Sequence, residues 1–307
     1  MVSAPSPQPG PAALKVPANP LMRALARCAV WLLALLSDET RLTMARALGL
    51  WVYRIGIRRR VTLENLQNAY PELPLPERER IARGAYANMA TAVVEALVSD
   101  HIPDAELDER LTLENWDRVE TAFAQGKGVL VATAHFGNWE LLGELLSRKG
   151  YPLHAVVRPL RGALNAHVME NRLKSGMKLI APRGAISQTL KSLHAGAAVA
   201  FLMDQGLSSK SALFVPFFGR PAATTPALSI AALRSGAPVL VVMAAREGRR
   251  LRVSVEGPFF PERTGDRDRD LQTHTARVTA AIEAVIRRNP EQWLWLHRRW
   301  KYTPPLG

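Results

Sequence analysis

Residues 128–140 read GVLVATAHFGNWE, and this stretch decides how the chain folds. The apolar run at 129–132 lies between turn signals and consists mostly of strand-forming residues, which predicts a buried β-strand. The Gly-Asn pair then ends the strand, and its asparagine is a good N-cap for a helix expected at 139–146. His135 should therefore lie at the carboxyl end of a strand, with Glu140 in the first turn of the next helix. In open α/β sheets, ligands bind in the crevice at this edge.

The alternation of strand and helix continues from this stretch to the C-terminus. Apolar runs predict further strands at 153–157, 177–180, 197–203, 238–244 and 251–255, and helices at 163–174, 186–194, 225–235 and 270–288. Before the central strand, helices are expected at 74–99 and 116–125, with a connector at 101–115. This alternation predicts an α/β domain with a mostly parallel central sheet flanked by helices.

The composition limits the classes of partner and compartment. The chain has 307 residues, of which 48% are hydrophobic, and this is enough for one large domain with an N-terminal appendage. Its net charge of +13 suggests an anionic partner such as nucleic acid, anionic lipid or an acidic protein. With Cys28 as the single cysteine, no disulfide can form within the chain, which favours a reducing compartment.

The first sixty residues differ from the body of the protein, residues 61–307. Residues 1–20 are rich in Pro, Ala and Ser and are expected to form a disordered tail without signal-peptide features. Residues 21–60 combine apolar stretches, two tryptophans and three consecutive arginines, which is typical of helices that lie on an anionic membrane. Their uncharged part, 28–36, is too short to span a bilayer of about 30 Å. An amphipathic helix packed on the body is the alternative, and a spanning helix is less favoured.

A histidine with a carboxylate in reach is the minimal set of groups for general-base catalysis. His135 would take a proton, and Glu140 would fix its tautomer and stabilise the imidazolium. The plainer alternative is a histidine at a strand end and an acidic residue at a helix start, where acids are favoured anyway. The segment HFGNWE at 135–140 also resembles the H-x4-D/E signature of membrane-associated glycerolipid and lipid A acyltransferases, in the form carried by the late lipid A acyltransferases.

Further motifs resemble the late lipid A acyltransferases in the same order along the chain. They are NLQNAYPE at 65–72, RP at 158–159, MDQ at 203–205, VPFFG at 215–219 and PEQWLWLHRR at 290–299. The family often carries a second acid at the position of Gly206, so the sequence departs from the pattern there. The resemblance covers roughly residues 65–301 and implies a glycerolipid acyltransferase-like fold, with residues 61–307 as the acyltransferase domain.

Four residues besides the catalytic pair are predicted to bind substrate. Arg158 directly follows a predicted strand, and its planar guanidinium would suit a phosphate or an oxyanion in the same crevice. Arg172 matches an arginine that the family carries about a dozen residues later. Asp204 would shape the site or bind a substrate hydroxyl, and Arg220 would bind an anionic head group. For each of them, a solvated arginine or a capping carboxylate is the plainer alternative.

Two aromatic-rich segments lack the periodicity of a helix or an ordinary strand. Residues 214–218 carry three phenylalanines beside Pro and Gly, and they could line a groove for an acyl chain. Trp293, Trp295 and Trp300 lie close to arginines, which suits a lipid–water interface. The alternative for both segments is core aromatics, followed by a solvated basic tail.

The resemblance implies transfer of a fatty acyl group from acyl-acyl carrier protein or acyl-CoA to a hydroxyl of a lipid A precursor or another glycolipid. His135 would take the hydroxyl proton, and Arg158 or backbone N–H groups near Gly137 would stabilise the oxyanion. No covalent intermediate, cofactor or metal is expected, since the chain has no G-x-S-x-G and no H-E-x-x-H. The expected location is the cytoplasmic face of the cell inner membrane, on an anionic surface.

Three other functions are the alternatives. The positive charge alone allows nucleic-acid binding, but the chain has no zinc finger, no RNP motif and no basic stripe with interleaved aromatics, so no nucleic acid is expected. An acyltransferase acting on another glycolipid or a lysophospholipid is the nearest alternative. The third is a non-catalytic membrane-surface protein of the same fold.

Overall fold

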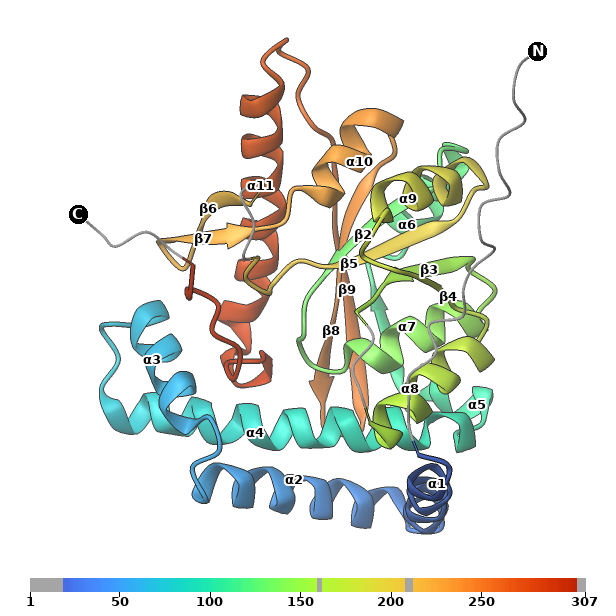
Figure 1. The fold of residues 1–307 in the computed structure, drawn as a ribbon, viewed down its shortest axis with the longest axis vertical. Helices are drawn as coiled ribbons and strands as arrows, with labels where there is room; N and C mark the ends of the chain where they lie inside the picture. Colours follow the sequence, from blue (N-terminus) through green and yellow to red (C-terminus); the bar gives the residue numbers. More distant parts are fainter. Residues whose placement is uncertain (1–18, 159–161, 208–211, 303–307) are drawn as a thin grey trace.

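The computed structural model of the protein describes residues 19–158, 162–207 and 212–302. The tail predicted at 1–20 lies outside these residues, apart from its last two, which are the N-cap and first residue of the first helix. Figure 1 shows a central sheet surrounded by helices, and this confirms the predicted α/β class.

Seven strands form the central sheet of the described chain. They are β1 (Leu111–Glu114), β2 (Val129–Thr133), β3 (Leu153–Val156), β4 (Lys178–Ile180), β5 (Ala198–Leu202), β8 (Val239–Glu247) and β9 (Arg250–Phe259). Their order across the sheet is β1-β9-β8-β2-β5-β3-β4, and all neighbours are parallel except β8 and β9. The predicted mostly parallel sheet is therefore confirmed. Its middle is formed by β2 and the neighbouring strand β5.

The seven helices predicted between residues 74 and 288 agree closely with the structure, whereas the helices before residue 70 were predicted without individual bounds. The helices of the described chain are α1 (Pro20–Ala34), α2 (Asp38–Arg54), α3 (Arg59–Ala69), α4 (Leu75–Val98), α5 (Asp104–Glu109), α6 (Asp117–Ala124), α7 (Trp139–Arg148), α8 (Ala163–Lys174), α9 (Ala185–His194), α10 (Ala227–Ser235) and α11 (Arg267–Arg288). The connector predicted at 101–115 is wrong, because it contains α5 and β1. Both elements are short and β1 is not buried, so neither leaves a clear apolar pattern.

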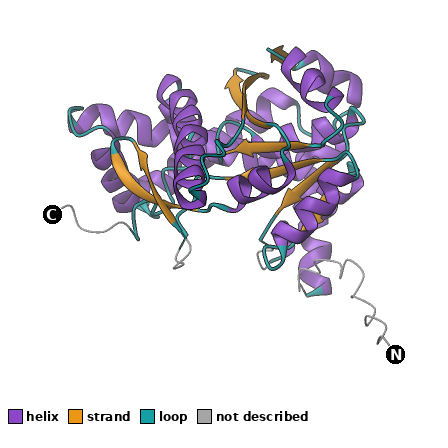
Figure 2. Ribbon diagram, turned by 90° about the horizontal axis from the view of Figure 1, so that it is seen from above, coloured by secondary structure: helices purple, strands orange, loops and turns teal. Residues whose placement is uncertain are grey.

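The central strands are buried on both faces, as their continuous apolar sequences predict. In β2, Leu130 and Ala132 pack in one cluster with side chains of α9, α10 and α11. Val129 and Val131 point the other way and pack in a second cluster with α6 and α7. Figure 2 shows the sheet between helices on its two sides. This double cover fixes β2 firmly, and with it the start of the loop that carries His135.

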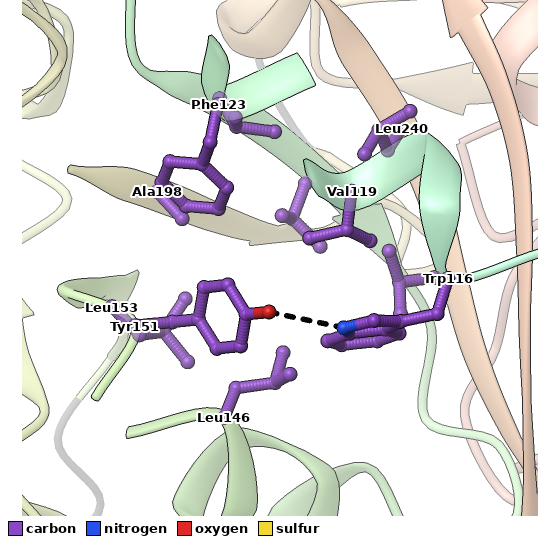
Figure 3. A pocket seen from close by; sticks show the side chains of 11 residues that line it. Trp116, Val119, Phe123, Leu146, Tyr151, Leu153, Ala198 and Leu240 are labelled. Carbon is purple, nitrogen blue, oxygen red and sulfur yellow. Dashed lines mark hydrogen bonds between the residues drawn. The ribbon is translucent and has the colours of Figure 1, made fainter. Parts of the chain in front are cut away.

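The second cluster contains a small void between α6, α7 and the sheet. It measures about 20 Å³ and is lined by apolar atoms, with Trp116 donating a hydrogen bond of 3.0 Å to the Tyr151 hydroxyl (Figure 3). Such a volume holds about one water molecule at most. This void is therefore a packing gap in the core, and the substrate site has to lie elsewhere.

Helix α4 crosses the carboxyl edge of the sheet, and α2 runs alongside its outer surface with α1 next to it (Figure 1). Leu42, Ala45 and Tyr53 of α2 are buried against the body, and Gly49 lies so close to the backbone of Tyr86 that a Cβ atom would clash. The opposite side of α1 and α2 exposes large apolar side chains. Within the described residues, no helix combines the length and the apolar character needed to cross a bilayer.

The VPFFG segment forms an antiparallel hairpin, β6 (Leu213–Phe217) with β7 (Arg220–Thr224), which the sequence analysis did not predict. Phe217 and Phe218 are buried and contact Trp293, while Phe214 is exposed. Trp295 is fully buried as well. The alternative of core aromatics is therefore confirmed for Phe217, Phe218, Trp293 and Trp295, because these rings pack on one another in the core and line neither an acyl groove nor a lipid interface.

Candidate active site

Three neighbouring strands deliver polar side chains to one edge of the sheet. β2, β5 and β3 lie next to each other and are parallel, and His135, Asp204 and Arg158 each follow the end of one of them. A cavity of about 590 Å³ opens at this edge, and both His135 and Arg158 line it. This volume is in the range of sites that take small organic ligands. The predicted crevice at the carboxyl edge is therefore confirmed.

Asp204 holds His135 by two hydrogen bonds. Its Oδ1 lies 2.9 Å from His135 Nδ1, and its Oδ2 accepts a hydrogen bond of 3.0 Å from the His135 backbone N–H. Because an ionised carboxylate only accepts hydrogen bonds, the Nδ1 atom carries the proton and Nε2 of the neutral ring is left as the basic nitrogen. The imidazole thus has the tautomer that a general base needs.

The two groups stabilise each other's charged forms. Burial lowers the pKa of His135, but the negative charge and hydrogen bond of Asp204 outweigh burial, so the net shift is upward. For Asp204, burial raises the pKa, yet the nearby His135 and its hydrogen bonds, with one from Trp293, lower it to about 2. The pair therefore favours an imidazolium beside a carboxylate, which is the arrangement reached after His135 has taken a proton.

Glu140 does not hold the His135 ring, and this corrects the predicted dyad. Arg172 binds both carboxylate oxygens of Glu140, through Nε at 2.8 Å and through a second, short bond from Nη2. The Trp139 indole N–H adds a bond of 3.0 Å. Glu140 still acts on His135 through its charge, which raises the imidazole pKa. Arg172 and Glu140 also line the cavity, so the structure brings both predicted residues to the site as a part-buried ion pair.

The C-terminal motif is part of this site, although it lies some 150 residues away in sequence. The Trp293 indole N–H donates to Asp204 Oδ2 at 2.8 Å, and the Leu294 backbone N–H donates to the His135 carbonyl at 3.0 Å. Trp293 also forms an isolated β-bridge with Phe136. The sequence did not predict this role, because its only signal is the abundance of tryptophan, which is also typical of a lipid-facing surface.

The turn after His135 is held by a second set of contacts. Gly137 has a φ of +56°, and a Cβ atom there would clash with the carbonyl of Ala244, so only glycine fits. Its N–H donates to the Gln292 carbonyl, and the Asn138 N–H donates to the Ala244 carbonyl. These N–H groups are already bonded, which removes them as the predicted oxyanion donors near Gly137. Asn138 caps α7 through Leu141, as predicted.

The walls of the cavity are mostly apolar beyond the polar edge. Helix α4 contributes Met89, Val93 and Leu97, and α8 contributes Leu164 and Val168. Leu97 packs in turn against Val30 of α1. The cavity therefore extends from the His135 imidazole between two helices toward the layer that carries the exposed apolar side chains. Such a shape suits an unbranched apolar chain with its reactive end at the imidazole.

The two remaining predicted arginines are placed differently. Arg158 is exposed at the cavity, and Pro159, the second residue of the predicted Arg-Pro pair, lies outside the described residues. Arg220 begins β7 in the hairpin and is not among the residues that line the cavity. The geometry therefore places Arg158 in the crevice, while head-group binding by Arg220 stays a prediction.

The sequence is similar to proteins whose names agree with the chemistry of this site. Residues 15–302 match the family model of the bacterial lipid A biosynthesis acyltransferases. The chain is 30% identical to the lipid A biosynthesis palmitoleoyltransferase of Escherichia coli strain K12 over 256 residues. The matched region covers 81% of this chain and 80% of that protein. The chain is 26% identical over 280 residues to the lauroyltransferase of the same strain, covering 90% of each chain. The myristoyltransferase is 23% identical over 276 residues, covering 89% and 84%. The chain therefore belongs to the bacterial lipid A biosynthesis acyltransferase family, and it is an acyltransferase.

Proposed function

We propose that the enzyme transfers a fatty acyl group from the thioester of acyl-acyl carrier protein, or of acyl-CoA, to a hydroxyl of a lipid A precursor. The observation that carries this proposal is the basic Nε2 atom of His135 at the polar end of an apolar cavity of about 590 Å³. The relatives named above are acyltransferases of lipid A biosynthesis, and the cavity suits the long apolar chain of an acyl donor.

The chemistry needs one base and no covalent intermediate. The acceptor hydroxyl attacks the thioester carbonyl carbon while His135 Nε2 takes its proton, and Asp204 stabilises the resulting imidazolium. When the tetrahedral intermediate collapses, the C–S bond breaks and the proton passes from His135 to the leaving thiolate. General-base catalysis of this kind contributes on the order of 10²–10⁴-fold. Glu140 adds negative charge near the ring and fixes Arg172 in place.

In this proposal, apolar side chains of the cavity bind the acyl chain, and charged side chains at its edge bind the phosphate groups of the substrates. The acyl chain lies between α4 and α8, against Val93, Leu97 and Val168. Arg158 is exposed at the same cavity and is suited to a phosphate of the donor or the acceptor. Head-group binding by Arg220 belongs to this proposal as well, at the hairpin and away from the cavity.

The N-terminal helices supply the membrane surface in this proposal. Leu25, Trp31 and Leu32 on α1 and Leu35 at its C-cap are more than half exposed, and Trp51 on α2 is as well. Exposed arginines accompany these apolar side chains on α2, at positions 46 and 54, and at the start of α3, at positions 58 and 60. Apolar side chains with nearby arginines bind anionic lipid in the plane of the interface. The enzyme then works at the cytoplasmic face of the inner membrane, where its acceptor lipid and an acidic carrier protein can both reach the positive surface.

A donor and acceptor panel tests the proposal. Purified enzyme in anionic vesicles receives acyl-acyl carrier protein or acyl-CoA, together with a lipid A precursor, another glycolipid or a lysophospholipid. We expect the mass of the lipid A precursor to increase by one acyl group, and the more efficient donor identifies the thioester used. Acylation of only the glycolipid or the lysophospholipid would contradict the lipid A acceptor. Lipid binding without acylation of any acceptor would contradict the catalytic role.

A further inference from the structure

Gln205 lies at the opening of the cavity, next to the basic nitrogen of His135. Its side-chain Nε2 is 3.3 Å from His135 Nε2, and Gln205 lines the same cavity. Because His135 Nδ1 donates to Asp204, the neutral ring presents Nε2 as an acceptor, so the Gln205 amide contributes its N–H₂ group to this contact. A donor therefore already points at the place that the acceptor hydroxyl occupies when it gives its proton to His135.

The backbone on both sides of Gln205 is held in place. Asp204 is fixed by its bonds to His135 and by the Trp293 indole, and Met203 N–H donates to the Thr133 carbonyl at 2.9 Å. On the other side, a Cβ atom at Gly206 would lie only 3.1 Å from the Arg299 carbonyl, so the chain passes close to the C-terminal segment. The exposed Gln205 side chain thus extends from a rigid base, as electrostatic stabilisation of a transition state requires.

Among the described residues, several other N–H groups near His135 are already bonded. The N–H groups of Gly137 and Asn138 bind backbone carbonyls, and the Trp139 indole and Arg172 bind Glu140. Arg158 follows β3, which β5 separates from β2, so two strand spacings of about 4.8 Å each lie between its backbone and that of His135. Gln205 follows β5, the direct neighbour of β2, and its amide is in direct contact with His135 Nε2.

We propose that Gln205 donates its side-chain N–H to the thioester carbonyl oxygen and stabilises the oxyanion during acyl transfer. When the acceptor hydroxyl bonds to His135 Nε2, the amide is released from the imidazole and turns to the adjacent carbonyl oxygen. The new C–O bond places negative charge on that oxygen, and the amide hydrogen bond strengthens as the charge develops. Collapse re-forms the carbonyl, breaks the C–S bond and leaves the amide unchanged. This assignment rests on the proposed acyl transfer from a thioester.

The variants Gln205→Ala and Gln205→Glu test the assignment, with Gln188→Ala as the matched control. Gln188 is an exposed glutamine on α9 and does not line the cavity, and Gln205 is itself exposed, so all three proteins should fold. Loss of one oxyanion donor typically lowers kcat on the order of 10²–10³-fold. We expect that loss in both Gln205 variants, with KM for the acyl donor changed less than threefold by the same reasoning, since the contact forms in the transition state. Gln188→Ala should match the wild type.

Equilibrium binding separates the oxyanion role from a role in substrate binding and does not depend on the acceptor. A phosphonate analogue of the tetrahedral intermediate and a non-hydrolysable thioether analogue of the donor are titrated into each protein. Gln205→Ala should lose affinity for the phosphonate and keep its affinity for the thioether. Equal losses for both analogues, or an unchanged kcat, would overturn the assignment. If the wild type acylated no acceptor yet Gln205→Ala still lost only the phosphonate, the acceptor proposal would fail while the role of Gln205 stood.

Discussion

His135 is set up as a base by a residue from another strand and not by its neighbour in sequence. Glu140 is five positions away and was expected to hold the ring, but both of its oxygens bind Arg172. Asp204 takes that role because β5 lies beside β2 and ends at the same edge. Residue types and spacing could predict which side chains reach the crevice. They could not predict which carboxylate touches the imidazole, since this depends on the order of the strands.

The pH dependence of Asp204→Asn tests this correction. In the wild type, the Asp204 charge raises the pKa of His135, so the neutral base forms, and kcat/KM rises, only above that raised value. Removing the charge lowers the imidazole pKa, so the acidic limb of the profile should move to lower pH. The maximum should also fall on the order of 10²–10⁴-fold, because the tautomer is no longer fixed.

Glu140→Gln provides the comparison for that profile. It leaves the Asp204 bonds to His135 intact but leaves the part-buried Arg172 beside a neutral partner, so it should lower the melting temperature. Its acidic limb should move less than that of Asp204→Asn, because the Glu140 charge acts on the ring without a hydrogen bond. If the acidic limb moved further in Glu140→Gln than in Asp204→Asn, Glu140 and not Asp204 would be the carboxylate that acts on His135, as the sequence predicted.

At the scale of the elements, the strands that are easiest to predict are those buried on both faces. β2, β5 and β8 are buried on both faces, so their sequences are continuous apolar runs that need no knowledge of their neighbours. The β6–β7 hairpin was missed because each of its strands contains a proline, Pro216 and Pro221, and because the adjacent Phe217 and Phe218 are both buried, which breaks the alternation of a strand. The packing of its rings against Trp293 and Trp295 depends on the tertiary fold, so their sequence context alone resembled an exposed lipid-binding surface.

Helix α1 should carry much of the membrane binding. Replacing Leu25, Trp31, Leu32 and Leu35 by serine removes exposed apolar area and leaves the buried Val30 in place, so the protein should stay folded. We expect it to stop floating with anionic vesicles in a density gradient, since the apolar area that enters the interface is lost. Phe260→Ser is the control, because Phe260 is exposed after β9, near the start of β8 and away from the carboxyl edge.

Flotation of the four-serine variant at the wild-type level would show that α1 is not the membrane-binding element. Point substitutions are preferable to removal of residues 1–57 for this purpose. Deleting α2 would expose the side of α4 that Leu42, Ala45 and Tyr53 cover, and loss of membrane binding could then follow from unfolding.

At the scale of the whole molecule, the active site joins three distant parts of the chain. His135 follows the central strand, Asp204 follows β5, and Trp293 comes from the C-terminal segment that locks both of them. In the C-terminal motif, Trp293 is thus buried where it bonds to Asp204, and the buried Trp295 packs against the Trp293 ring.

Trp293→Phe and Trp295→Phe form a matched pair that tests this connection. Both rings are buried, but only Trp293 donates to Asp204, whereas Trp295 donates to the Pro290 carbonyl at 2.7 Å. A hydrogen bond to a charged group contributes about 1.5–3 kcal/mol, so Trp293→Phe should lower kcat/KM on the order of tenfold or more. Trp295→Phe should change stability without a comparable loss of rate. Equal values of kcat/KM in the two variants would show that the Trp293 hydrogen bond to Asp204 does not contribute to catalysis.

The most direct measurement of the central claim is the rate of acyl transfer by His135→Ala compared with the wild type, in anionic vesicles with acyl-acyl carrier protein and a lipid A precursor. The substitution removes the base and leaves the apolar cavity walls intact, so folding, vesicle binding and donor binding should persist. Transfer should fall by at least about 10²-fold, the lower bound expected for loss of a general base. Transfer at close to the wild-type rate in a folded, membrane-bound His135→Ala protein would contradict the mechanism.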